Sequence, residues 1–129
     1  MAFDIEKEIK ITLIVGFIIT IIYGLWFLIS VESWVALNNW PYLDPVAGRI
    51  LGSVYTTLAI VLLKAYKEAD EWEKLENIVL FMAVNCILAA IMSIFSHVVF
   101  NLPATYILNI IIYIVLGILN THIYIQKRK

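Results

Sequence analysis

Four runs of predominantly apolar residues dominate this sequence, and each is about as long as a helix that crosses a membrane. They cover residues 11–30, 45–63, 75–100 and 102–125. About 20 apolar residues in helical form span a hydrocarbon core of about 30 Å. Because lipid offers no hydrogen-bonding partner to an open strand, each run is predicted to be a helix.

The composition favours the same class of protein. Of the 129 residues, 63% are hydrophobic and 15% are charged, whereas soluble domains are about 45–50% apolar and about 25% charged. A water-soluble protein of this composition would expose large apolar patches. Residues 1–129 are therefore expected to form a single integral membrane domain.

Basic residues give the expected orientation. Eight of the nine lie in segments predicted on one side of the membrane, and Arg49 alone lies on the other. The eight are Lys7, Lys10, Lys64, Lys67, Lys74, Lys127, Arg128 and Lys129. The positive-inside rule then places both the N- and the C-terminus in the cytoplasm. The predicted fold is an all-α, antiparallel bundle of four transmembrane helices, multi-pass in the cell membrane.

Two outer connections differ in length. Residues 31–44 form the longer one, and its Trp34, Trp40 and Tyr42 are ring types that favour the headgroup zone. A short re-entrant or surface-lying helix is expected there, and residues 39–42 are expected to form a turn. The connection from Asn101 to Thr105 contains a proline and is short. It predicts a close hairpin between the third and fourth helices.

Small residues mark one face of each of the first two helices. The second helix is expected to begin at Asp44, a capping residue, followed by a proline at the first helical position. Small residues that recur every fourth position let neighbouring helices in a membrane approach closely. The predicted packing residues are Gly16, Thr20 and Gly24 in the first helix and Gly48, Gly52 and Thr56 in the second.

The third and fourth helices each carry a polar stripe. Taken together as one polar stripe, their main members are Asn85, Ser93, Asn109, Tyr113 and Asn120. These groups either hold the helices together by hydrogen bonds or line a polar path or pocket between them. No Asp, Glu, Lys or Arg lies deep inside an apolar run, whereas proton relays and ion pumps usually need a titratable group there, and this favours packing.

A second candidate cluster lies at the outer rim and comprises Arg49, His97 and Tyr106. Arg49 is about one turn into the second helix, so its guanidinium can reach the outer surface. It either anchors the helix there or contacts an anion or a lipid headgroup. The cluster is therefore a candidate site for a lipid or an isoprenoid quinone.

Several kinds of chemistry find no support in the sequence. His97 and His122 are predicted near opposite membrane faces, roughly 20 Å or more apart at about 1.5 Å per residue, so one haem cannot join them. The single cysteine, Cys86, excludes an internal disulfide, and the net charge of −1 gives no general attraction to nucleic acid. Metal-ligand spacings and phosphate-binding loops are also missing. We expect no cofactor, no metal, no nucleic-acid partner and no enzymatic activity.

Three hypotheses for function remain. The first is a non-enzymatic membrane protein that assembles, through its small-residue faces, with a second copy or with a larger membrane complex. The alternative is a small oligomeric transporter or channel that uses the polar stripe of the third and fourth helices. The second alternative is lipid or quinone binding at the outer rim. Membrane lipid is the one partner common to all three.

Overall fold

The computed structural model describes residues 4–41 and 44–129 of the chain. Within these residues the regular structure consists of four helices, each long and apolar enough to cross a membrane. They are α1 (Ile5–Leu37), α2 (Pro45–Lys67), α3 (Trp72–Phe100) and α4 (Tyr106–Lys127). The prediction of an all-α protein with four candidate membrane helices is confirmed.

Helix α2 begins where the sequence predicts. The carboxylate of Asp44 accepts hydrogen bonds of 3.0 Å from the backbone N–H groups of Val46 and Ala47. These N–H groups have no partner within the helix, so the cap stabilises its first turn. Asp4 caps α1 in the same way, by accepting a bond from the N–H of Glu6.

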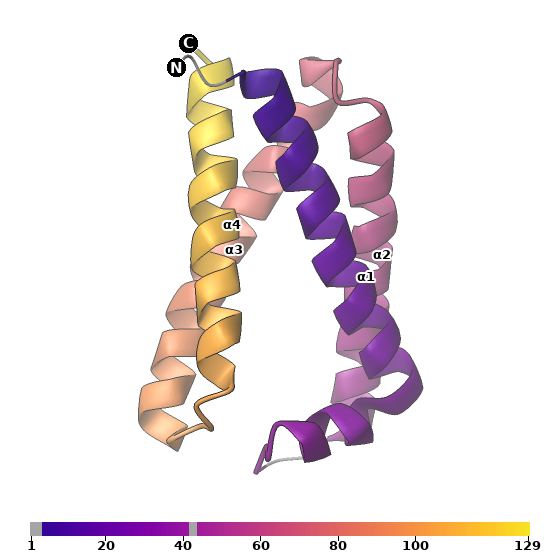
Figure 1. The fold of residues 1–129 in the computed structure, drawn as a ribbon, viewed down its shortest axis with the longest axis vertical. Coiled ribbons are helices and arrows are strands. Elements are labelled where there is room, and N and C mark those ends of the chain that lie inside the picture. Colours follow the sequence, from indigo (N-terminus) through magenta and orange to yellow (C-terminus); the bar gives the residue numbers. More distant parts are fainter. Residues whose placement is uncertain (1–3, 42–43) are drawn as a thin grey trace.

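Several helix boundaries differ from the predicted ones, among them the end of α1 and the start of α4, and Tyr42 of the predicted outer turn lies outside the described residues. Helix α1 continues beyond residue 30, but Ser30 is non-helical (φ −152°, ψ 64°), and the remaining turns bend away from the axis (Figure 1). The hydroxyl of Ser33 donates to the carbonyl oxygen of Ser30 at 2.8 Å, which satisfies a backbone group that the kink has freed. Helix α4 begins at Tyr106 rather than at residue 102, because α3 ends at Asn101 in the left-handed conformation (φ 50°) and a turn follows.

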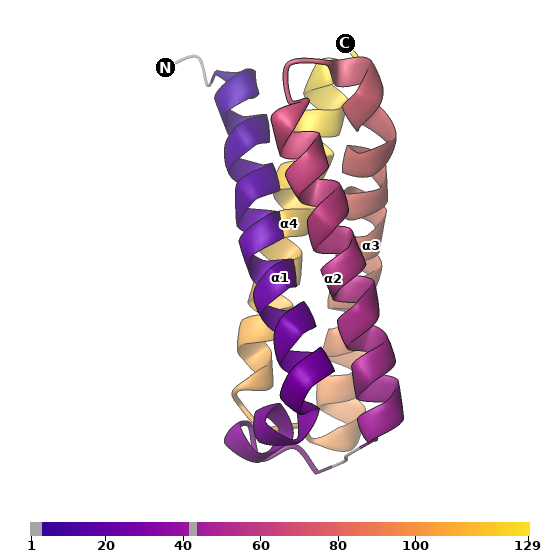
Figure 2. The same cartoon turned by 90° about the vertical axis from the view of Figure 1, so that its right-hand side faces the viewer.

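The helices form two hairpins, α1 with α2 and α3 with α4 (Figures 1 and 2). The start of α1, the end of α4 and the α2–α3 connection lie at one end of the molecule, which we call the termini end. The opposite end, called the linker end, holds the α1–α2 linker and the α3–α4 turn. The hairpins converge at the termini end and diverge toward the linker end (Figure 1).

The apolar core lies at the termini end, where all four helices meet. Its largest fully buried apolar side chains are Ile9, Leu13, Leu62, Leu75, Val79 and Ile123. Polar contacts close the same end: His122 Nδ1 lies 2.8 Å from a carboxylate oxygen of Glu8, and Lys10 pairs with Asp70 at 2.8 Å. The Glu8 side chain is only 10% exposed, and its second oxygen has no hydrogen-bond partner among the described residues.

Helices α1 and α2 touch through their backbones. A Cβ atom at Gly52 would lie 2.7 Å from the backbone nitrogen of Leu28 and 3.0 Å from the carbonyl oxygen of Gly24. A Cβ at Gly24 would meet the backbone of Thr56 at 2.7 Å. Lipid supplies no hydrophobic force to hold helices together, so this close packing is the main attraction between the two helices.

Gly52→Ala should therefore lower the free energy of unfolding by about 1–3 kcal/mol, the usual cost of overpacking. Gly117→Ala is the matched control. The nearest atoms to a Cβ at Gly117 lie 3.5 Å away, which is ordinary contact distance. The control should be neutral or stabilising by up to about 1 kcal/mol, because alanine favours helix over glycine. Unfolding by denaturing detergent measures both variants, and equal effects would contradict the backbone contact.

Candidate functional site

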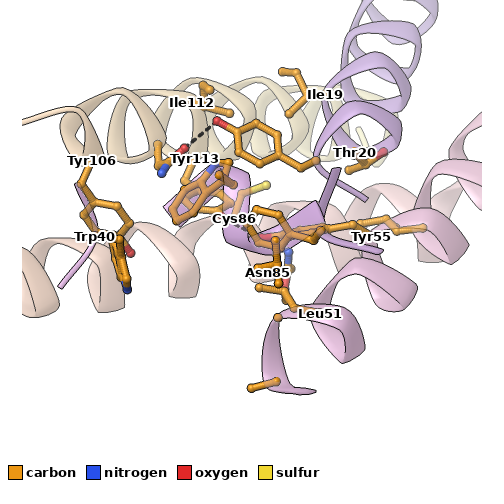
Figure 3. Close-up of a pocket in the computed structure, with 18 of the residues that line it drawn as sticks. Ile19, Thr20, Trp40, Leu51, Tyr55, Asn85, Cys86, Tyr106, Ile112 and Tyr113 are labelled. Atoms are coloured by element: carbon orange, nitrogen blue, oxygen red, sulfur yellow. Dashed lines mark hydrogen bonds between the residues drawn. The ribbon is translucent and has the colours of Figure 1, made fainter. Parts of the chain in front are cut away.

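A cavity of about 380 Å³ lies between the two hairpins, in the half of the molecule near the linker end (Figure 3). All four helices and the α1–α2 linker contribute to its walls. It begins beside Trp40 and Tyr106 and ends against Met82 and Leu116, which belong to the core. The cavity exists because the hairpins diverge away from that core.

The part of the cavity nearest the linker end, bordered by Trp34, Trp40 and Tyr106, is here called its mouth. Aromatic rings line this mouth in a continuous chain. Ring centroids lie 5.1 Å apart between Phe27 and Trp34, and 5.5 Å apart between Trp34 and Trp40. Trp40 then contacts Tyr106 of α4 at 5.1 Å, so the chain crosses from one hairpin to the other. Such tilted and edge-on pairs stabilise by about 0.5–1.5 kcal/mol beyond their burial.

Two hydrogen bonds join the hairpins further inside. The hydroxyl of Tyr23 donates to the side-chain oxygen of Asn109 at 2.9 Å, linking α1 to α4. The hydroxyls of Tyr55 and Tyr113 lie 2.7 Å apart and link α2 to α4. These polar groups thus have partners within the protein, and they fix the width of the cavity at this level.

Asn85 differs from Asn109, the other carboxamide that lines the cavity. Its carboxamide lines the cavity from α3, beside Tyr55 and Leu51 (Figure 3). It forms no hydrogen bond with any residue in the described part of the chain. An amide without a partner in an apolar environment is costly. The Asn85 side chain is therefore available to bind a ligand, as are the indole N–H groups of Trp34 and Trp40 nearer the linker end, which also have no hydrogen-bond partner in the described residues.

The five residues of the predicted polar stripe have different environments. Asn85, Asn109 and Tyr113 line the cavity. Ser93 instead accepts a hydrogen bond of 3.1 Å from the hydroxyl of Tyr106, and Asn120 is buried and donates to the carbonyl oxygen of Leu116 at 2.8 Å.

The three residues of the predicted outer-rim cluster also have separate partners. Arg49 forms an ion pair of 2.8 Å with Glu32. Tyr106 lines the cavity, and the Nδ1 atom of His97 is buried with no hydrogen-bond partner in the described residues. No hydrogen bond or ion pair within residues 4–41 and 44–129 connects Arg49, His97 and Tyr106 to one another.

The predicted packing residues lie on the side of α1 and α2 where these helices face each other. Gly24, Gly52 and Thr56 form the backbone contact described above. A Cβ at Gly48 would meet the side chain of Val31, and one at Gly16 would lie 3.3 Å from Leu62. Thr20 is buried beside them and donates to the carbonyl oxygen of Gly16. These small faces are thus occupied by contacts within the chain.

Sequence reasoning did not identify Phe27 and Tyr55 as cavity residues. The spacing of both residues from the small-residue faces could have indicated this position. Phe27 lies three residues after Gly24, and Tyr55 lies three residues after Gly52, so each borders a small-residue face. Aromatic rings next to such a face are placed at the edge of the helix interface, where they reach into the space between the hairpins.

Apolar and aromatic groups make up most of the cavity wall. Asp44, at the mouth, is the one charged side chain among the described residues that line it. The described ranges contain no group of three or more His, Cys, Asp or Glu side chains placed to hold a metal ion. Comparisons with protein-family models, curated proteins and solved structures found no match to this chain. The site must therefore be interpreted from its own geometry.

The bond between Tyr55 and Tyr113 can be measured with a double-mutant cycle. Tyr55→Phe and Tyr113→Phe each remove one hydroxyl and keep the ring. We expect a coupling of about 0.6 kcal/mol in the free energy of unfolding, the average for hydrogen bonds between membrane helices. The control cycle pairs Tyr55→Phe with Tyr124→Phe, whose ring packs on Trp72 at the termini end. In that cycle the effects of the two substitutions on the free energy of unfolding should add to within about 0.3–0.5 kcal/mol.

Proposed function

We propose that this chain is a non-enzymatic, multi-pass protein of the cell membrane that binds an uncharged amphiphilic molecule between its hairpins. The observation that carries the proposal is the carboxamide of Asn85, which has no partner in the described chain and lines an apolar cavity. In this proposal the helices cross the membrane as an antiparallel bundle with both termini in the cytoplasm. The mouth of the cavity then faces outward.

The chemistry of the wall supports an uncharged ligand with a hydrogen-bonding group. A carboxamide both donates and accepts, so it suits a ketone, ester, hydroxyl or amide. A charged head would find no opposite charge beside Asn85, and burial without one is costly at this depth. The volume of about 380 Å³ falls in the range of small-molecule sites, which are about 300–1,000 Å³ and mostly apolar. This proposal develops the lipid-or-quinone hypothesis and moves it from the rim to the cavity.

Assembly with a second copy or with a larger membrane complex is the second candidate. Helices α2 and α3 make few contacts with each other, and the hollow between them is lined mostly by apolar side chains. A partner helix laid against that hollow would bury them. Assembly through the faces of Gly24 and Gly52 has less support, because those faces already pack against each other.

The ligand proposal predicts that Asn85→Leu lowers affinity about tenfold, since one lost hydrogen bond and the ligand group left unpaired cost about 1.4 kcal/mol. Binding of a monoacylglycerol and of an isoprenoid benzoquinone to detergent-solubilised protein can be followed by native mass spectrometry. Gln126→Leu is the control, because this exposed amide lies near the end of α4, outside the cavity lining. Failure of the wild-type protein to retain either amphiphile would refute the proposal, as would full retention by Asn85→Leu.

The orientation predicts which face of the membrane carries the basic tail at Lys127–Lys129. Trypsin should remove this tail in inside-out vesicles and leave it intact in right-side-out vesicles. The control site is Arg49, the basic residue near the start of α2 at the opposite end of the molecule. A single cysteine placed there, in a Cys86→Ala background, should react with an impermeant maleimide only in right-side-out vesicles. Cleavage of the tail from the outside would overturn the orientation.

A further inference from the structure

A second hollow, here called the side groove, opens between α2 and α3. Its volume is about 580 Å³, and its walls come from Leu51–Val61 on α2, Asn77–Ala89 on α3 and the ring of Tyr113. Most of this lining is apolar. Val54 and Phe81 are each 55% exposed on its surface. In a bilayer such a surface faces hydrocarbon chains rather than water.

The side groove and the central cavity share part of their walls. Tyr55, Tyr113 and Asn85 line both of them, together with Leu51 and Leu58. The hydroxyls of Tyr55 and Tyr113, 2.7 Å apart, join two of these shared side chains. Helices α2 and α3 have few contacts, so side chains rather than packed backbones separate the two hollows. The paired rings of Tyr55 and Tyr113 therefore stand at the boundary between the two hollows.

We propose that the side groove is a lateral portal, through which the amphiphile passes from the bilayer into the cavity with Tyr55 and Tyr113 as its gate. This inference rests on the proposed function. The occupant of the groove is the ligand's hydrocarbon tail, an acyl or isoprenoid chain, while its uncharged head bonds to Asn85. Since Asn85 lines both hollows, one molecule can hold its head there and leave its tail in the groove.

The mouth at the linker end is a poor route for such a ligand. The contacting rings of Trp34, Trp40 and Tyr106 border it, and Asp44 adds a carboxylate. An amphiphile that used the mouth would have to take its tail out of the hydrocarbon and past this rim. Exposure of every CH₂ group to water on the way is unfavourable. Along the side groove the tail never leaves an apolar environment.

Substitutions that fill one opening at a time can test the route. Ala89 and Ser53 line the side groove but not the cavity, and they come from opposite walls, α3 and α2. Ala47 lines the cavity near its mouth but not the groove. Ala89→Trp and Ser53→Trp therefore narrow the portal, and Ala47→Trp is a matched control that narrows the mouth by the same side chain.

The full-length protein is reconstituted into vesicles with a monoacylglycerol that carries a diazirine in its tail. After mixing, the sample is photolysed at increasing times, and mass spectrometry measures labelling of the peptide that contains Asn85. We expect each portal variant to slow the initial labelling roughly tenfold, since substitutions in one site change association rates by about one to three decades. Each rate is taken from labelling divided by its own final extent, so that slower entry is separated from a loss of bound ligand, and Ala47→Trp should keep the wild-type rate.

The results that would contradict the portal differ from those that would contradict the proposed function. Slow labelling of Ala47→Trp, with normal rates in both portal variants, would place access at the mouth and overturn the portal while leaving the proposed function intact. Absence of cavity labelling in the wild-type protein would overturn the proposed function itself. If labelling of the groove disappears as the protein-to-lipid ratio rises, a second copy covers the groove, and the portal is again refuted.

Discussion

The contact between the backbones of α1 and α2 is the interaction on which the rest of the structure depends. In lipid, apolar side chains gain nothing by leaving their surroundings for a neighbouring helix, so attraction requires close packing. Gly24 and Gly52 provide it, because each leaves room for the backbone of the opposite helix. The first hairpin is therefore a tightly packed pair, and it is tilted against the second pair. The inter-hairpin cavity is a consequence of that tilt (Figure 1).

Side-chain size along each helix determines where the hairpins touch and where they separate. At the termini end, aliphatic side chains such as Leu13, Leu75 and Ile123 interlock in one core. Toward the linker end, the first hairpin carries the rings of Phe27 and Tyr55, which line the cavity and lie 6.3 Å apart between centroids. Polar groups at this level must find partners, and the pairing across the cavity satisfies them. Asn85 remains without a partner in the described chain, and this gives the cavity its chemistry.

The all-helical class and most of the residues that pack α1 against α2 could be predicted from the sequence, because both follow from local rules. Apolar length identifies the helices, Asp44 with Pro45 marks the start of α2, and small residues four apart give its packing face. Which residues of the polar stripe line the cavity and which bond elsewhere could not be predicted in this way. Asn85 and Asn120 look alike in sequence, yet one lines the cavity and the other bonds within its own helix. That difference depends on the tilt between hairpins, which no single helix encodes.

The cavity is closed at the termini end by the apolar core, and this bears on the choice between the proposed binding of a ligand and its transport. Passage of a ligand to the termini end would require the hairpins to part there, which means breaking the contacts of Glu8 with His122 and of Lys10 with Asp70. It would also open the most tightly packed part of the apolar core to the ligand. The proposed exchange through the side groove would need neither step, because the groove lies where α2 and α3 already have few contacts. The closed termini end therefore supports the proposed binding of an amphiphile over the alternative of a channel.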